Sequence, residues 1–194
     1  VIEISPSSPH HINPLEIARG YGTGENPVAM KSELMMSICE QQMGAGQLGA
    51  FHKSIIDRCV ALVLQEQKKT GKVPTLCTLR EKLLEQPEQE ARDLALTMEL
   101  YTSGSLNIFA HETNVDTRNR IQSYDIHDLG EELKQPGFVT ITDAMINRVN
   151  YNWAHGKKTH IFVDEFHIAY ENEYSGNFFT SAWRQFRKRN AAPC

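Results

Sequence analysis

The sequence contains no G-x-x-x-x-G-K-[ST] motif, the loop whose backbone N–H groups and lysine hold nucleotide phosphates. A literal G-x-G-x-x-G occurs at Gly44, Gly46 and Gly49. We expect a helix before it, whereas the dinucleotide-binding fingerprint follows a strand, so we predict a glycine-rich turn between helices. The stretch from Gly20 to Gly24 also lacks the lysine. The sequence therefore offers no recognisable phosphate-binding loop.

Other absences exclude further classes of protein. Cys39, Cys59, Cys77 and Cys194 have no C-x-x-C spacing, and the first two lie on expected apolar helix faces. We therefore expect reduced core thiols in a cytosolic protein and no zinc site. No apolar run is long enough to span a bilayer. The formal net charge of −4 gives no overall field that would attract nucleic acid, although a local basic patch stays open.

An apolar run followed by two carboxylates is the most informative stretch that is present. Ile161, Phe162 and Val163 precede Asp164 and Glu165. The run predicts a strand covered on both faces within a parallel sheet, with the carboxylates at its carboxyl end, where open α/β sheets bind ligands. This is a Walker B arrangement, in which Asp164 holds Mg²⁺ through water and Glu165 is the catalytic base. The alternative is a buried strand that ends in charge where it meets solvent.

The order of expected elements predicts an α/β fold with a helical insertion. Residues 1–4 alternate as in a short strand, and residues 26–103 read as four helices with short connections. Residues 121–126 predict a second strand, and residues 136–155 a helix that leads into the strand of Asp164. We expect strand, helix and strand to form one right-handed βαβ unit.

Two helix starts and one helix face are predicted in the insertion. Asn26 is the expected N-cap of the first helix, and Thr75 or Thr78 that of the third. The second helix, over residues 47–69, carries the most periodic stripe. The stripe runs through Leu48, Phe51, Ile55, Cys59, Leu62 and Glu66, and Ile56, Val60 and Val63 widen it. We expect this stripe to be buried and Phe51→Asp to unfold the insertion.

The last expected helix starts at Ser175 or Asn177. Its aromatic stripe of Phe179, Trp183 and Phe186 predicts a core face rather than a platform for stacking bases. The basic residues at its end favour the helix dipole. Both ends of the chain read as cut: it starts directly in a strand pattern and stops without a settled element. We therefore expect a piece of a longer protein.

With these elements in place, the sequence resembles the conjugative-transfer ATPases of type IV secretion systems, the TraC/VirB-type branch of the FtsK/HerA-like P-loop ATPases. The stretches that carry the resemblance are Ile12-Asn13-Pro14-Leu15, Gly104-Ser105-Leu106-Asn107, Thr113-Asn114-Val115-Asp116, Tyr124-Asp125-Ile126-His127-Asp128-Leu129-Gly130, Ile161-Phe162-Val163-Asp164-Glu165-Phe166-His167 and Arg187-Lys188-Arg189. They follow one another in the family's order over nearly the whole chain.

The resemblance implies part of a RecA-like P-loop ATPase core, mostly parallel sheet, with an inserted all-helical subdomain. Residues 1–25 would begin the core, residues 26–104 form the insertion, and residues 105–194 return to the core with the Walker B strand. The activity implied is ATP hydrolysis with Mg²⁺, with Asp164 associated with the metal and Glu165 as the base. One of Arg187 or Arg189 would act as an arginine finger on a neighbouring subunit.

The resemblance also implies a setting. The parent would work as a ring or dimer at the cytoplasmic, inner face of the cell membrane, together with other secretion-channel proteins. It would power pilus assembly or substrate transfer. Because the family's P-loop lies upstream of a segment like residues 1–4, we expect this chain alone to be inactive. Two alternatives stay open: a non-catalytic protein-interaction module, and a DNA-translocase motor of the same superfamily.

Overall fold

The computed structural model describes residues 1–17, 26–117, 119–164, 167, 170 and 173–193. The described elements, in chain order, are β1 (Ile2–Glu3), α1 (Pro27–Met43), α2 (Ala50–Thr70), α3 (Leu76–Leu84), α4 (Gln89–Thr97), α5 (Glu99–Thr102), η1 (Asn107–Phe109), β2 (Tyr124–Asp125), η2 (His127–Leu129), α6 (Glu131–Ala154), β3 (Thr159–Ile161), α7 (Glu173–Lys188) and β4 (Ala191–Pro193). None of these helices combines the length and the hydropathy that crossing a membrane would need.

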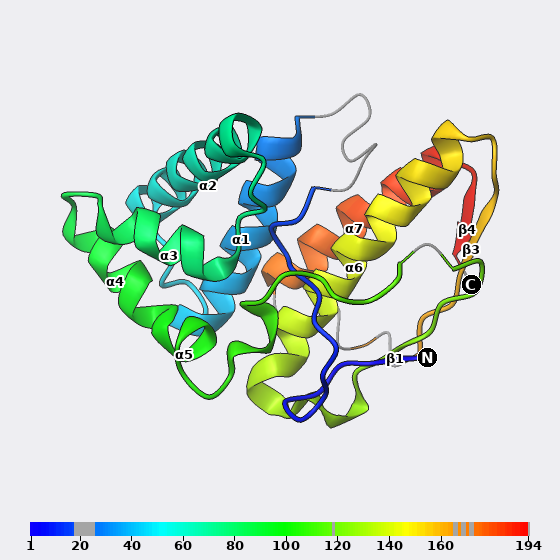
Figure 1. Ribbon diagram of the computed structural model, residues 1–194, viewed down its shortest axis with the longest axis horizontal. Helices are drawn as coiled ribbons and strands as arrows, with labels where there is room; N and C mark the ends of the chain where they lie inside the picture. The colour runs from blue at the N-terminus through cyan, green and yellow to red at the C-terminus, as the bar shows by residue number, and fades with distance from the viewer. Residues whose placement is uncertain (18–25, 118, 165–166, 168–169, 171–172, 194) are drawn as a thin grey trace.

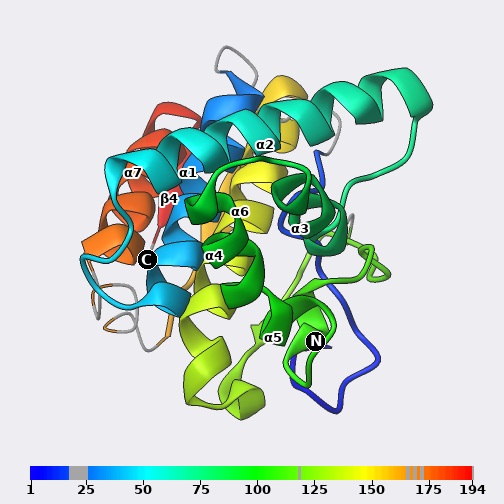
Figure 2. The same cartoon turned by 90° about the vertical axis from the view of Figure 1, so that its left-hand side faces the viewer.

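The helices form two groups that share α1 (Figures 1 and 2). Helix α2 packs on α1, α3 packs on α2 and α4, and α4 also contacts α1. On its other side α1 packs against α6 and α7, which lie against each other and beside the strands (Figure 1). The predicted domain limits at residues 26 and 104 stay predictions, because α1 belongs equally to both groups.

Capping residues explain where two of these helices begin. The Asn26 side chain accepts a hydrogen bond from the Val28 N–H (3.0 Å), as predicted for an N-cap residue. Thr75, not Thr78, is the N-cap of α3, and its N–H donates to the Thr78 hydroxyl (3.3 Å). These local bonds satisfy N–H groups that a helix cannot satisfy internally.

The predicted buried face of α2 was right only in part: Ile55 and Cys59 are buried as expected, whereas Phe51 and Leu62 are not. Phe51 is 74% exposed and Leu62 is 38% exposed. Helix α2 begins at Ala50, three residues later than expected, so Phe51 lies in its first turn. The buried residues of α2 are Ile55, Ile56, Cys59, Val60, Val63 and Leu64. The residues that only widened the predicted stripe, such as Val60, are therefore at its centre.

The strands pair differently from the expectation. β1 pairs in parallel with β2, with Ile2 opposite Tyr124, and β3 pairs in parallel with β4, with Thr159 opposite Ala191. Among the described residues these are two separate two-stranded sheets. The predicted βαβ unit of β2, α6 and β3 was therefore wrong as a pairing, and the continuous parallel sheet of a RecA-like core is not formed by the described part of the chain. The parallel unit observed is β3, α7 and β4.

The apolar run before Asp164 is only partly covered. Strand β3 comprises residues 159–161, two residues before the predicted position, and its last residue, Ile161, is 6% exposed. Phe162 follows the strand and is 74% exposed. The expectation of a strand covered on both faces was therefore wrong. The chain end was also misjudged, since residues 191–193 form β4.

A buried ion pair ties the two groups of helices together. Lys31 on α1 donates to the Asp143 carboxylate on α6 (2.6 Å) and to the Pro14 carbonyl (2.7 Å). The side chains of Lys31 and Asp143 are 0% and 3% exposed. Burial lowers the pKa of Lys31, and the adjacent Asp143 carboxylate opposes that shift.

Candidate functional site

Asp164 lies just beyond the carboxyl end of β3, as the sequence predicted. It lines a cavity of 310 Å³ between the end of β2 and the segment after β3. The lining residues are Ser123, Tyr124, Asp125, Ile126, His127, Phe138, Ile141, Thr142, Met145, Phe162, Val163, Asp164 and Phe179. We call this cavity the strand-end cavity.

The floor of the strand-end cavity is a small apolar cluster. Phe138 on α6 and Phe179 on α7 pack with their ring centroids 5.4 Å apart, and both are buried. Ile126 and Val163 pack against them from the two strand ends. The aromatic stripe of α7 is therefore core, as predicted. It supports the chain on either side of Asp164 rather than offering faces to bases.

Strand β2 brings a second carboxylate to this cavity. Asp125 is the last residue of β2, and its Oδ1 accepts a hydrogen bond from the His127 N–H (3.1 Å). The sequence placed Asp125 at the end of a strand but assigned it no role. The signal that identifies it is the one used for Asp164, an acid directly after a strand. Among the described residues β2 and β3 belong to separate two-stranded sheets, so Asp125 and Asp164 are related by the one cavity that both line.

The polar groups of the cavity fit one part of a Mg²⁺–nucleotide site. Mg²⁺ is held in many phosphate-binding enzymes by one or two carboxylates, with waters and phosphates completing its coordination. Asp164 and Asp125 are groups of that kind. The described residues contain no cluster of three or more His, Cys, Asp or Glu that would hold a metal unaided. The phosphate side of such a site has to come from other residues.

The remaining predicted site residues are placed unevenly. Glu165 lies outside the described residues. Arg187 is exposed in the last turn of α7. Arg189 is 7% exposed, and its Nη1 donates to Gln185 Oε1 (2.7 Å) while its guanidinium lies 6.0 Å from the Trp153 ring centroid.

Arg187 and Arg189 precede β4, so they lie toward the start of β3, whereas Asp164 follows its end. Helix α7 has 16 residues and is therefore about 24 Å long, and it ends next to β4, whose first residue pairs with the first residue of β3. Asp164 follows the opposite end of β3. The structure therefore does not bring Arg187 or Arg189 to the carboxylate of its own chain.

The glycine-rich turn between α1 and α2 is occupied internally. The buried carboxylate of Glu40 accepts hydrogen bonds from the N–H groups of Gly46 (2.5 Å) and Leu48 (3.1 Å). A carboxylate thus holds the amides that a phosphate would need. This confirms that the G-x-G-x-x-G sequence is a helix–helix turn.

In the described part of the chain, α1, α6 and α7 pack together beside short parallel strands, and Asp164 follows β3. A solved structure described as VirB4 of Thermoanaerobacter pseudethanolicus shares this fold, with a TM-score of 0.72 and 16% sequence identity. The match covers 99% of this chain and 55% of that chain, so this chain spans about half the length of its neighbour. The likeness to a VirB-type ATPase is thereby confirmed at the level of the fold.

Sequence comparisons add no family assignment. No protein-family model matches the chain. No curated protein sequence matches it either. At 16% identity the relationship is visible in the fold, and the activity has to be argued from the site.

Proposed function

We propose that the chain is part of the motor ATPase domain of a type IV secretion or conjugation system. The observation that carries the proposal is the position of Asp164, at the carboxyl end of β3 in a fold shared with VirB4 over 99% of the chain. The parent protein would couple ATP hydrolysis to substrate transfer or pilus assembly. It would lie in the cytoplasm, at the inner face of the membrane, within the secretion complex.

Within that function, Asp164 orients the water molecules around a nucleotide-bound Mg²⁺, and Glu165 removes a proton from the attacking water. Mg²⁺ itself would neutralise charge on the transferred phosphate. The phosphate-binding loop belongs to sequence upstream of Val1. The chain alone is then the carboxylate half of a site and does not turn over ATP.

Of the two candidate arginine fingers, Arg187 is the better placed. A finger must extend to the phosphate of a neighbouring subunit, and Arg187 is exposed. Arg189 is buried and bonded to Gln185, so extending it would break contacts within its own chain. The proposal therefore assigns the action in trans to Arg187, within a ring or dimer.

Two other functions compete. In a non-catalytic interaction module, helices α2 to α5 would dock to channel proteins and Asp164 would be inert. Exposed apolar residues on these helices, such as Phe51 and Leu96 at 74% and 69% exposure, favour this reading. A DNA-translocase motor is the second alternative, and the net charge of −4 weighs against it.

Phosphate release by a longer chain that carries the P-loop separates these functions. Glu165→Gln should keep ATP binding and lower turnover by about 10²-fold or more, because it removes the general base. Asp164→Ala should also weaken Mg²⁺-dependent nucleotide binding. The control is Asp57→Ala, which removes an exposed carboxylate on α2. Turnover of Glu165→Gln equal to that of Asp57→Ala would exclude the catalytic role and leave the interaction module.

A further inference from the structure

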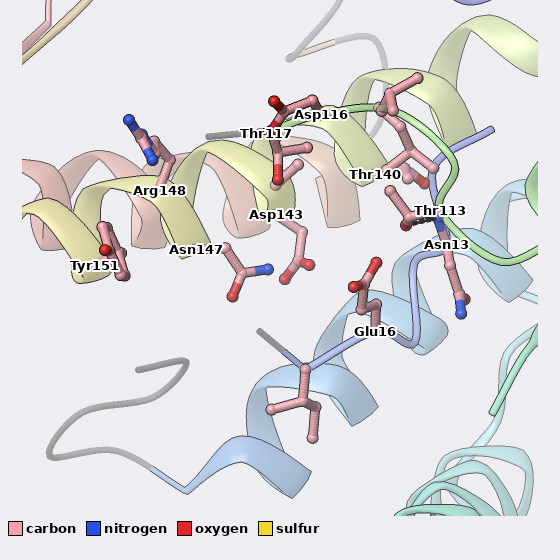
Figure 3. A pocket seen from close by; sticks show the side chains of 14 residues that line it. Asn13, Glu16, Thr113, Asp116, Thr117, Thr140, Asp143, Asn147, Arg148 and Tyr151 are labelled. Atoms are coloured by element: carbon pink, nitrogen blue, oxygen red, sulfur yellow. Dashed lines mark hydrogen bonds between the residues drawn. The ribbon is translucent and has the colours of Figure 1, made fainter. Parts of the chain in front are cut away.

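A second cavity lies on another face of α6, and the proposed ATPase function makes no use of it. Its volume is 610 Å³, within the range of small-molecule sites. Residues 12–17, residues 113–117 and α6 from Thr140 to Tyr151 form its walls (Figure 3). We call it the α6 cavity. Two of the three walls include the stretches Ile12-Asn13-Pro14-Leu15 and Thr113-Asn114-Val115-Asp116, which contribute to the family resemblance but have no function in the proposed ATPase site.

The α6 wall is a polar stripe. Thr140, Asp143, Asn147 and Tyr151 follow one another at spacings of three and four residues, which places them on one helix face. The stripe lies in a helix that is buried over much of its length. A polar face in the wall of a cavity suits a polar occupant.

Two oxygen atoms on this stripe have no hydrogen-bond partner among the described residues. They are Thr140 Oγ1, in a residue 1% exposed, and Asn147 Oδ1, itself buried. Thr142 on the same helix satisfies its hydroxyl by donating to the Phe138 carbonyl (2.8 Å), which Thr140 does not do. Leaving a buried polar atom unpaired is unfavourable. These two oxygens are therefore unpaired polar atoms in the wall of the cavity, and the Thr140 hydroxyl can donate as well as accept.

The nearest buried cation is not available to an occupant. Lys31 is fully buried and commits its ammonium to Asp143 and to the Pro14 carbonyl. Arg148 donates to the Asn119 carbonyl (3.3 Å) and lies over the Tyr151 ring. In Figure 3 its side chain points away from Glu16.

Glu16 adds a carboxylate to the cavity, which Asp116, Asp143 and Arg148 also line. It is half-buried, and its carboxylate accepts no hydrogen bond from the described residues. In Figure 3 the side chains of Glu16, Asp143 and Asn147 converge on the same space from two segments of the chain. With acceptors on both walls, a complementary group must carry positive charge and several N–H donors.

The geometry points to a binding site for a guanidinium group on an aliphatic chain. Glu16 accepts the charged N–H groups, and Asn147 Oδ1 and Thr140 Oγ1 accept the remaining donors. A guanidinium has five donors in a planar fork, which suits acceptors spread over two walls better than the compact ammonium of lysine. Ile12 and Ile17 line the cavity and offer contact for an aliphatic chain. The group belongs either to a free molecule or to an arginine side chain of a protein segment.

Calorimetry on the 194-residue chain tests the site with two probes. Agmatine is a free aliphatic guanidine, and a short peptide with one central arginine represents a protein segment. We expect saturable binding of at least one probe at submillimolar concentration. Carbamoylputrescine, which replaces the guanidinium of agmatine by a neutral urea and keeps its terminal ammonium, should bind at least about tenfold more weakly, because it lacks the charge of the guanidinium. Binding of the peptide alone would assign the site to a protein segment.

A pair of isosteric variants locates the binding. Glu16→Gln should weaken the probe at least about tenfold. Glu81→Gln, which removes an equal charge from an exposed position on α3, should leave binding unchanged. The backbone amide NMR signals of Thr140 and Asn147 should shift on titration of the bound probe. Absence of saturable binding by both probes, or equal binding by the two variants, would show that water alone fills the cavity.

Discussion

Lys31 and Asp143 form a contact on which the arrangement of the whole chain depends. Both side chains are almost completely buried, and their 2.6 Å contact joins α1 to α6. Transferring each of these charged groups from water to the protein interior costs several kcal/mol. The electrostatic attraction between them offsets this cost only when their hydrogen-bond geometry is good. The bond from Lys31 to the Pro14 carbonyl adds a third segment to the same point.

Lys31→Met should therefore destabilise the protein by about 3–5 kcal/mol, because it leaves the Asp143 carboxylate buried without its cation. Urea unfolding followed by circular dichroism measures this change. The double variant Lys31→Met with Asp143→Leu should recover most of the loss, since it removes both charges. A double variant less stable than Lys31→Met would show that the pair itself, rather than the unpaired charge, supplies the stability.

At the scale of single residues, the sequence identified some site groups and missed others. Asp164 was found because an acid after an apolar run is a local signal. Thr140 and Asn147 were missed because nothing in their neighbours along the chain reveals that α6 faces a cavity there. Only the fold brings residues 12–17 and 113–117 opposite them. A site residue that follows a recognisable local pattern can be predicted from the sequence. A site assembled from three segments that are distant in the sequence cannot.

Helix α2 shows how an element can be predicted correctly and oriented wrongly. Its existence follows from the three- and four-residue spacing of apolar residues. Two adjacent stripes fit that spacing, one through Phe51 and one through Val60. Val60 is fully buried while Phe51 is 74% exposed, and Leu62 in the middle of the helix is exposed as well.

This difference gives a matched pair of substitutions on one helix. Val60→Asp should destabilise the chain by at least about 3 kcal/mol, because it places an unpaired charge in the core. Phe51→Asp should change stability by no more than about 0.5 kcal/mol, as is usual at exposed positions. Thermal melts followed by circular dichroism compare the two. If Phe51→Asp lowers the melting temperature as much as Val60→Asp does, Phe51 belongs to the buried face of α2 after all.

The strands were harder to predict than the helices for a physical reason. Ile161 and Phe162 belong to one apolar run, yet Ile161 is buried and Phe162 is exposed. Whether a side chain of the run is buried depends on which elements pack against it, and the run itself does not reveal this. Strand β4 contains Ala191 and Ala192, which carry no strand preference that a sequence would reveal. Its pairing with β3 is a long-range property, set by the packing of α7.

At the scale of the molecule, the two groups of helices and the short paired strands share their fold with part of VirB4. The chain matches VirB4 over 99% of its own length and 55% of that protein's chain. Asp164 and Asp125 both line the strand-end cavity. In the glycine-rich turn between α1 and α2, the Glu40 carboxylate already accepts the backbone N–H groups that a phosphate would need. We therefore propose that this chain supplies the carboxylates of a nucleotide site and that the phosphate-binding groups come from other residues of the parent protein.

Titration of Mg²⁺–ATP by calorimetry, against this 194-residue chain and against a longer chain carrying G-x-x-x-x-G-K-[ST], tests that division most directly. Phosphate recognition requires consecutive backbone N–H groups, a helix N-terminus and the motif lysine, and carboxylates alone repel a triphosphate. We expect the shorter chain to bind no better than about 1 mM and the longer chain to bind in the micromolar range, since weak metal binding by one or two carboxylates gains strength only from phosphate partners. A micromolar dissociation constant for the 194-residue chain would contradict the account, because it would require a phosphate-binding site within residues 1–194.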